Sequence, residues 1–313
     1  MLALLASPAM GQVNGAAILD PHPPKLLSEF GFFAGDAPAG GVVPYVISAP
    51  LFSDYAEKDR FIYSPIPAPA QVEGVLQFPV GAALIKTFRY GAHRVETRVL
   101  LHQEAGWRGF AYVWNDAGSD AVLALAGADL VVPREGAADL AYHVPNVNQC
   151  KACHSGSDKA MVPIGPKLRN LNSGDQLERL AAAGVVAEAA GDIPVMPDYR
   201  DEAVDIALRA RAYLDANCAH CHSPGHPADT SGLFLNWEET EPAHLGINTR
   251  PVAAGKGTGD LTFDVVPGKP EQSILLLRMM SLDPGAMMPE LGRSVVHEEG
   301  VALIRDWISG LED

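Results

Sequence analysis

The stretch Asn217-Cys-Ala-His-Cys-His222 organises the rest of this 313-residue chain, and it has an earlier counterpart in Gln149-Cys-Lys-Ala-Cys-His154. Both stretches contain Cys-x-x-Cys-His, the pattern through which a haem is attached covalently to a polypeptide. A short helical turn sets the two thiols at the separation of the two vinyl groups of one porphyrin. The histidine that follows supplies a neutral imidazole nitrogen to the iron as the proximal ligand.

The two motifs use all four cysteines of the chain, so none is left for a structural disulfide. A zinc site built from the same four thiols is the competing interpretation, but it leaves the two histidines unexplained. The pattern therefore predicts two covalently bound haem c groups, one on Cys150, Cys153 and His154 and the other on Cys218, Cys221 and His222.

Composition and charge limit the class of protein. With 30 glycines and 25 prolines, the chain is expected to have many loops and limited regular structure. The net charge of -15 argues against a nucleic-acid partner. An acidic redox protein is expected to meet redox partners that carry a basic docking face. The sequence leaves the oligomeric state open.

The first residues, MLALLASPAMGQ, are typical of the end of a secretory signal, with a short apolar run followed by small residues. We expect residues 1–19 to be a leader remnant and the protein to be periplasmic or otherwise exported. A disordered apolar N-terminus is the alternative. No later stretch has the roughly 18 uninterrupted apolar residues of a transmembrane helix, so none is expected.

Residues 20–140 have the pattern of a β-rich domain. Short runs of alternating apolar and polar residues follow one another, with Gly81, Gly91 and Gly106 at or beside the turns. Such spacing predicts a β-sandwich or jelly-roll-like domain. The expected strands cover 75–78, 83–90, 95–102, 107–114, 121–125 and 130–132.

The second half of the chain has a helical pattern around the two motifs. Helices are expected over 176–190, 202–217, 273–280 and 298–311, with a long loop from 223 to 270. This order predicts two small, mainly α domains of the class I cytochrome c type, the first over 141–200 and the second over 201–313. The predicted fold class is therefore α+β and multidomain.

A haem with histidine on one face needs its other face explained, because the distal ligand sets the redox chemistry. For the second haem we expect Met288, which lies 66 residues after His222 (288 minus 222), directly before Pro289 and ahead of the last helix. Met287, Met279 and Met280 are expected to pack instead.

For the first haem the candidate is Met196, which is also followed by proline and lies 42 residues after His154 (196 minus 154). Met161, His143 and His102 remain alternatives. The other histidines considered are expected at the surface; these are His93, His226, His244 and His297.

Several further stretches resemble a family of bacterial dihaem c-type cytochromes. The similarity covers nearly the whole chain, and it is carried by the residues at 50–56, 78–81, 96–98, 114–117 and 209–222. The resemblance implies an exported redox protein, in some cases associated with dehydrogenases. It implies no substrate.

These observations favour an electron-transfer protein over a catalyst. Single electrons would pass between a periplasmic dehydrogenase, or another redox partner, and the respiratory chain, with the β-domain serving for docking or shielding. One alternative is a dihaem peroxidase or oxidase with an open first haem. The 68 residues between Cys150 and Cys218 (218 minus 150) argue against it, because dihaem peroxidases place far more chain between their two motifs. Another is a β-domain that binds a ligand through aromatic residues such as Trp107, Tyr112 and Trp114, with the haems as a relay.

Overall fold

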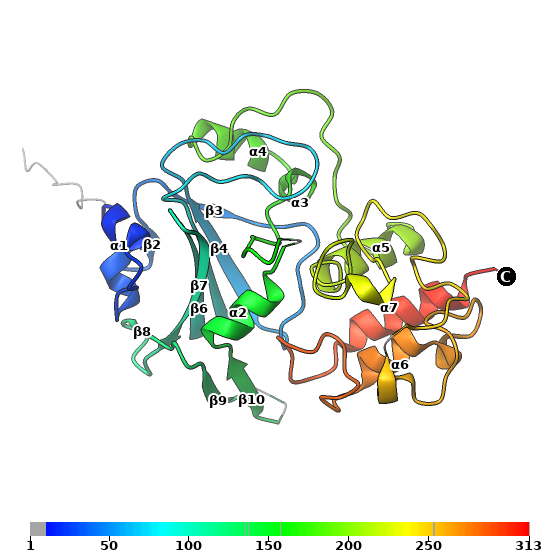
Figure 1. Ribbon diagram of the computed structural model, residues 1–313. Helices are drawn as coiled ribbons and strands as arrows, with labels where there is room; N and C mark the ends of the chain where they lie inside the picture. Colours follow the sequence, from blue (N-terminus) through cyan, green and yellow to red (C-terminus); the bar gives the residue numbers. More distant parts are fainter. Residues whose placement is uncertain (1–10, 135, 137, 157, 253, 313) are drawn as a thin grey trace, which may run out of the picture.

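A six-stranded antiparallel sheet forms the centre of the computed structural model, which describes residues 11–134, 136, 138–156, 158–252 and 254–312 (Figure 1). The strands lie in chain order, so each one pairs with its neighbours in sequence. They are β3 (Val42–Tyr45), β4 (Glu57–Tyr63), β5 (Ala83–Tyr90), β6 (His93–Gln103), β7 (Gly106–Trp114) and β8 (Ala121–Leu123). Two small antiparallel pairs accompany it, β1 (Phe33–Ala34) with β2 (Ala37–Pro38) and β9 (Ala128–Val132) with β10 (Leu140–Val144).

The helices are short, and most of them follow the sheet in the chain. They are α1 (Gly15–Leu19), α2 (Val147–Cys153), α3 (Leu168–Leu171), α4 (Gln176–Ala182), α5 (Ile206–Asn217), α6 (Ile274–Met280) and α7 (Glu298–Ser309). Four 3₁₀ turns complete the list: η1 (Leu27–Phe30), η2 (Asp229–Ser231), η3 (Gly255–Thr258) and η4 (Pro270–Gln272). Within the described ranges, no helix is both long and apolar enough to cross a membrane, as the sequence predicts.

The strand period of two residues gives the sheet two different faces. One face presents Ile85, Val99 and Phe110 to the N-terminal segment, where Ile18 and Phe30 are buried against it. The opposite face has an apolar region at one end. There Ile62 and Leu84 form a core with residues of α3 and α4, namely Leu168, Leu171 and Leu180.

The C-terminal helices share a separate core beside the sheet (Figure 1). Tyr213 and Leu214 of α5 pack there with Leu276 of α6 and Ile304 of α7. Helix α7 comes so close to α5 that Gly300 has no room for a side chain against the Tyr213 ring. The two helices are thereby fixed to each other directly beside the second cysteine motif.

Residues 46–56, which we call the bridging segment, leave β3 and contact the C-terminal helices before returning to β4 (Figure 1). The ring of Phe52 stacks on His297, with centroids 4.1 Å apart. The Tyr199 hydroxyl donates to the Pro50 carbonyl at 2.7 Å. Sheet and C-terminal helices are thus joined by packing and by hydrogen bonds.

The predicted fold class is wrong in both of its parts. A sandwich or jelly roll requires two packed sheets, whereas one sheet in chain order is present, accompanied only by two-stranded pairs, in the part of the chain that the structure describes. Strand alternation predicts that a face is buried, but it does not tell what covers it; here one cover is the N-terminal segment and the other includes helices.

The two cytochrome-like domains also do not appear. Helices α3 and α4, expected within a domain over 141–200, bury their apolar side chains on the sheet and share its core. Over the described ranges the protein is mostly a β-sheet domain with a few short helices, and no small helical domain of the cytochrome c type is evident. The helical periodicity predicts helices correctly, but not where their apolar faces pack.

The structure differs from the expected elements at three further places. The expected strand at 75–78 is a loop. The helix expected over 176–190 ends at Ala182, shortly before Gly184 adopts a φ of +70°. The helix expected from 202 begins at Ile206, because the Asp205 side chain accepts hydrogen bonds from the backbone N–H groups of Ala207 and Leu208.

The expected leader over 1–19 lies partly outside the described residues, which begin at 11. Its last part forms α1, where the Asn14 side chain caps the helix and Ile18 is fully buried in the core of the sheet. The predicted boundary at 140 falls inside the pairing of β9 with β10, in which Leu140 lies opposite Val132.

Candidate functional site

The first motif begins inside helix α2 and ends at its C-cap. Asn146 and Gln149 form a reciprocal cap at the start of the helix, each side chain accepting from the other backbone N–H at 2.9 Å. Cys150 and Cys153 are three residues apart in this helix, so their thiols lie on the same side. The N–H of His154 donates to the Cys150 carbonyl at 3.1 Å, which places the imidazole directly after the thiol pair.

The second motif is built to the same plan at the end of α5. Cys218 is the C-cap of this helix, and its carbonyl accepts from the N–H of Cys221 at 3.1 Å. The same carbonyl accepts from the N–H of His222 at 2.9 Å, so the histidine again follows a single closed turn. Two unrelated segments of chain therefore present two thiols and an imidazole in the same local geometry.

Both imidazoles are oriented by a backbone carbonyl further along the chain. His154 Nδ1 lies 2.8 Å from the Val162 carbonyl, and His222 Nδ1 lies 3.2 Å from the Leu233 carbonyl. Because a carbonyl only accepts, Nδ1 carries the proton and Nε2 keeps a free lone pair. Burial lowers the pKa of His154 to about 3 and also lowers the pKa of His222. Each imidazole is therefore neutral, the form that binds a metal.

The four thiols are free, and the two motifs lie close to each other. Burial raises the pKa of Cys221 to about 11, and the nearby Cys153 thiol of the other motif contributes to this rise. His220 likewise contributes to the lowered pKa of His154. In the described residues no three side chains of His, Cys, Asp or Glu are grouped to hold a metal ion, so the thiols do not assemble the alternative zinc site.

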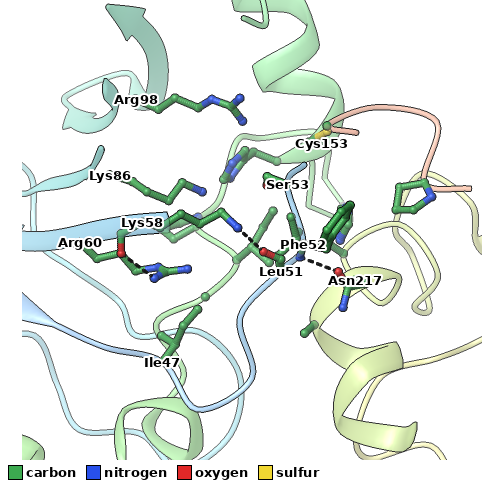
Figure 2. A pocket seen from close by; sticks show the side chains of 18 of the residues that line it. Ile47, Leu51, Phe52, Ser53, Lys58, Arg60, Lys86, Arg98, Cys153 and Asn217 are labelled. Carbon is green, nitrogen blue, oxygen red and sulfur yellow. Dashed lines mark hydrogen bonds between the residues drawn. The ribbon is translucent and has the colours of Figure 1, made fainter. Parts of the chain in front are cut away.

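A cavity lies between the sheet, the first motif and the C-terminal helices (Figure 2). Cys150, Cys153 and His154 line it from one side. Met288 lines it from the chain ahead of α7. Figure 2 shows Phe52 of the bridging segment at this cavity, with its N–H bonded to Asn217, the residue before the second motif.

The two predicted distal methionines are placed differently. Met288 is half-buried at the cavity, and its N–H donates to the Arg278 carbonyl at 2.9 Å. Arg278 also contributes to the lowered pKa of His222. Met196 is only 1 % exposed, in the core of the C-terminal helices, and it is not among the residues that line the cavities beside His154.

The three alternative distal ligands of the first motif lie in different surroundings. Met161 and His102 line a second hollow beside His154. His102 Nδ1 lies 2.8 Å from the Phe78 carbonyl, and the imidazole ring stacks on the Trp107 indole with centroids 4.6 Å apart. The Trp107 indole is therefore already packed against a side chain of this protein. His143 uses both ring nitrogens, which bond with Asp129 at 2.7 Å and Gln149 at 3.0 Å, and it has no nitrogen left for a metal.

Other residues that the sequence analysis placed at the surface or did not single out also lie at the site. His297 is not a surface residue, because its side chain is only 12 % exposed and stacks on Phe52. His220, inside the second motif, lines both hollows, and its Nδ1 atom is buried without a hydrogen-bond partner in the described residues. His93 is exposed, as expected.

A row of basic residues on the sheet face toward the first motif was not predicted from the sequence. Lys58 and Arg60 come from β4, Lys86 from β5 and Arg98 from β6, and all four line the cavity (Figure 2). A detectable signal existed at Lys86, which follows the apolar run Ala83-Leu84-Ile85 of β5. Two further basic residues near the motifs, Lys167 and Arg169, are already engaged, since both pair with Asp215.

The side chains present fit two covalently attached haems. Each motif offers a thiol pair on one turn and a neutral imidazole whose Nε2 is free. Lys58, Arg60 and Lys86, which form no salt bridge within the described residues, line the cavity beside the first motif, and the carboxylates of a porphyrin require such cations. No family model, curated protein or solved structure matches this chain. The functional assignment therefore rests on the donor sets and on their geometry.

Proposed function

We propose that the protein is an exported dihaem c-type cytochrome that transfers single electrons between a periplasmic redox partner, such as a dehydrogenase, and the respiratory chain. The observation that carries the proposal is the duplicated geometry of the motifs. In both, the histidine N–H bonds to the first cysteine carbonyl, at 3.1 and 2.9 Å, and Nδ1 is held by a later carbonyl. Haem iron would supply reversible one-electron oxidation and reduction at each site.

The residues of this chain would hold and tune the two groups. Cys150 and Cys153 would bind one porphyrin through thioethers, with His154 as its proximal ligand. Cys218, Cys221 and His222 would do the same for the other. We propose Met288 as the distal ligand on the His222 side, because Arg278 connects the two: its carbonyl accepts from Met288, and its charge acts on His222.

The closeness of the motifs supports electron transfer. The Cys153 thiol acts electrostatically on the Cys221 thiol, although the two cysteines are 68 residues apart in sequence (221 minus 153). Two redox groups attached at these positions would be neighbours. The net charge of -15 suits encounter with a basic face on a partner protein.

A catalytic function, with the first haem open on one face, is the second candidate. It gains support from the cavity beside His154 and from the place of Met196 in the core. Carbon monoxide binding to the reduced protein, followed by its visible spectrum, separates the two. An electron-transfer protein with both irons fully ligated binds none, whereas an open haem binds one equivalent.

The test of the proposal is haem attachment itself. The full chain is produced in a host that attaches haem c, and its intact mass is measured together with the visible spectra of both oxidation states. We expect the mass of the chain plus two haems. The double variants C150A/C153A and C218A/C221A should each lose one haem, whereas K151A, which changes a spacer residue of the first motif, should keep both. A mass equal to the bare chain would overturn the proposal.

A further inference from the structure

Three of the four cavity cations lie in one row across neighbouring strands. Arg60 of β4 is the direct register partner of Lys86 of β5, and Lys86 is the direct partner of Arg98 of β6. Lys58 lies two residues before Arg60 and therefore faces the same side. Like charges directly opposite each other destabilise a sheet, so this row is costly unless a negative group faces it.

The protein supplies little of that negative charge. Glu96 is fully buried, but it accepts from Arg98 at 3.0 Å and from the Tyr142 hydroxyl, so it is already engaged. Lys58 Nζ and an Arg60 amino group bond only to neutral carbonyls, those of Leu51 at 2.6 Å and Lys58 at 3.2 Å (Figure 2). Lys86 has no acidic side chain bonded to it anywhere in the described ranges, and its ammonium lies 5.1 Å from the Phe88 ring.

The surroundings show how unfavourable this charge is without a partner. Burial, with repulsion by Arg98 and Arg60, lowers the pKa of Lys86 to about 7. Burial and the same kind of repulsion lower the pKa of Lys58 far below its usual value. A bound anion would restore the ammonium form of both lysines.

The row is also placed where a ligand can reach it. Figure 2 shows Lys58, Lys86 and Arg98 extending toward the same space as Cys153. One residue pair further along this face, Ile62 and Leu84 are buried against α3 and α4. The cations therefore begin where the helical cover ends and the cavity opens.

We propose that Lys58, Arg60, Lys86 and Arg98 form a binding site for a carboxylate or a small oxyanion, held between the sheet and the first Cys-x-x-Cys-His motif. Charge-assisted hydrogen bonds from lysine and arginine are the contacts that such a group prefers. The inference rests on the proposed function for one of its two sources. The anion is either the propionate edge of the porphyrin on Cys150 and Cys153 or a free anion that enters the cavity.

The experiment uses the full chain with its haems attached, after the intact mass has shown how many are present. Lys86→Met removes one cation, and Arg60→Gln is a second variant that removes a different one. Lys25→Met makes the same change as the first at an exposed position. Acetate and inorganic phosphate are titrated calorimetrically at constant ionic strength, and the reduction potentials of all four proteins are measured.

Two results support the proposal and identify the source. With a free anion, the wild type binds acetate or phosphate, and K86M and R60Q bind it about tenfold or more weakly, while K25M does not differ. If propionates occupy the site, no added anion binds. K86M and R60Q then lower the potential of one haem, because removing a neighbouring positive charge makes the oxidised, more positive state less unfavourable. K25M again leaves the potentials unchanged.

The proposal is overturned if no added anion binds and the potentials of K86M and R60Q equal those of K25M. The calorimetric titration does not depend on haem. A chain whose mass lacks haem but which still binds phosphate through Lys86 would therefore contradict the proposed function and leave the anion site standing.

Discussion

The backbone N–H of Phe52 donates to the side-chain oxygen of Asn217 at 2.8 Å, and Asn217 is the residue immediately before Cys218. Asn217 is only 3 % exposed, and its amide nitrogen donates to the Tyr213 carbonyl at 2.9 Å. One buried amide thus joins the bridging segment of the sheet to the end of α5. It is one of the contacts that hold the second motif in place relative to the sheet.

We expect Asn217→Ala to lower the free energy of unfolding by about 1–3 kcal/mol, because it leaves the buried Phe52 N–H without an acceptor. Urea denaturation followed by circular dichroism measures this. Asn148→Ala, at an exposed position, is the matched control and should change stability by less than about 0.5 kcal/mol. Equal stability of the two variants would contradict the assigned role of Asn217.

Asp54 makes another connection from the bridging segment. It is 3 % exposed, and its carboxylate accepts from the N–H groups of Ser294 and Val295 at 2.6 and 3.0 Å. Asp54→Ala should lower the free energy of unfolding by about 2–3 kcal/mol, since two buried donors lose a charged acceptor. Asp54→Asn keeps one oxygen and should cost less. Thermal denaturation of both, with exposed Asp116→Ala as reference, tests this order, and a reversed order would rule out the hydrogen-bonding role.

Asp215 of α5 holds a buried group of charges beside the motifs. Its carboxylate pairs with Lys167 at 3.1 Å and Arg169 at 3.3 Å and accepts from the Trp237 N–H at 2.9 Å. Asp215→Ala leaves Lys167 and the Trp237 N–H without their acceptor, while Arg169 keeps Glu238, and it should cost about 3 kcal/mol of unfolding free energy. Asp215→Asn should be milder in the same urea titration. A stability of D215A within 1 kcal/mol of wild type would show that water replaces the carboxylate.

Local patterns predicted much of this molecule. Alternation through Thr97, Val99 and Leu101 correctly indicates β6. The Cys-x-x-Cys-His spacing likewise predicts one helical turn per motif, which both motifs adopt. These features depend on residues only a few positions apart, so the sequence contains all the information they need.

Long-range features were not predictable in the same way. Arg60, Lys86 and Arg98 are far apart in the chain, and only the strand register places them in one row. The cover of the sheet by α3 and α4, in place of a second sheet, is also decided by packing between distant segments. Met196 and Met288 share the same local context before proline, yet only Met288 reaches the cavity.

His297 should make stability depend on pH. Burial lowers its pKa to about 4, whereas an unfolded histidine titrates near 6.5. The unfolded chain therefore binds the proton first, so the neutral ring stabilises the fold above about pH 6.5, and this contribution falls as the pH drops toward 4. The loss amounts to about 3 kcal/mol for this shift. In urea titrations across this range, His297→Gln should lose less stability than wild type, and parallel curves would exclude His297 as the source.

Met288 and Met196 offer a matched pair of substitutions. Met→Leu preserves volume and costs less than about 1.5 kcal/mol in a core, so both variants should fold. Met288 lies at the cavity near Arg278, and loss of a thioether ligand should lower the potential of one haem and open its iron to carbon monoxide. Met196 is enclosed by the C-terminal helices, so M196L should keep the wild-type potentials. Redox titration of the haem-loaded variants decides between them: a lowered potential in M196L, with M288L unchanged, would restore Met196 as the ligand and remove Met288.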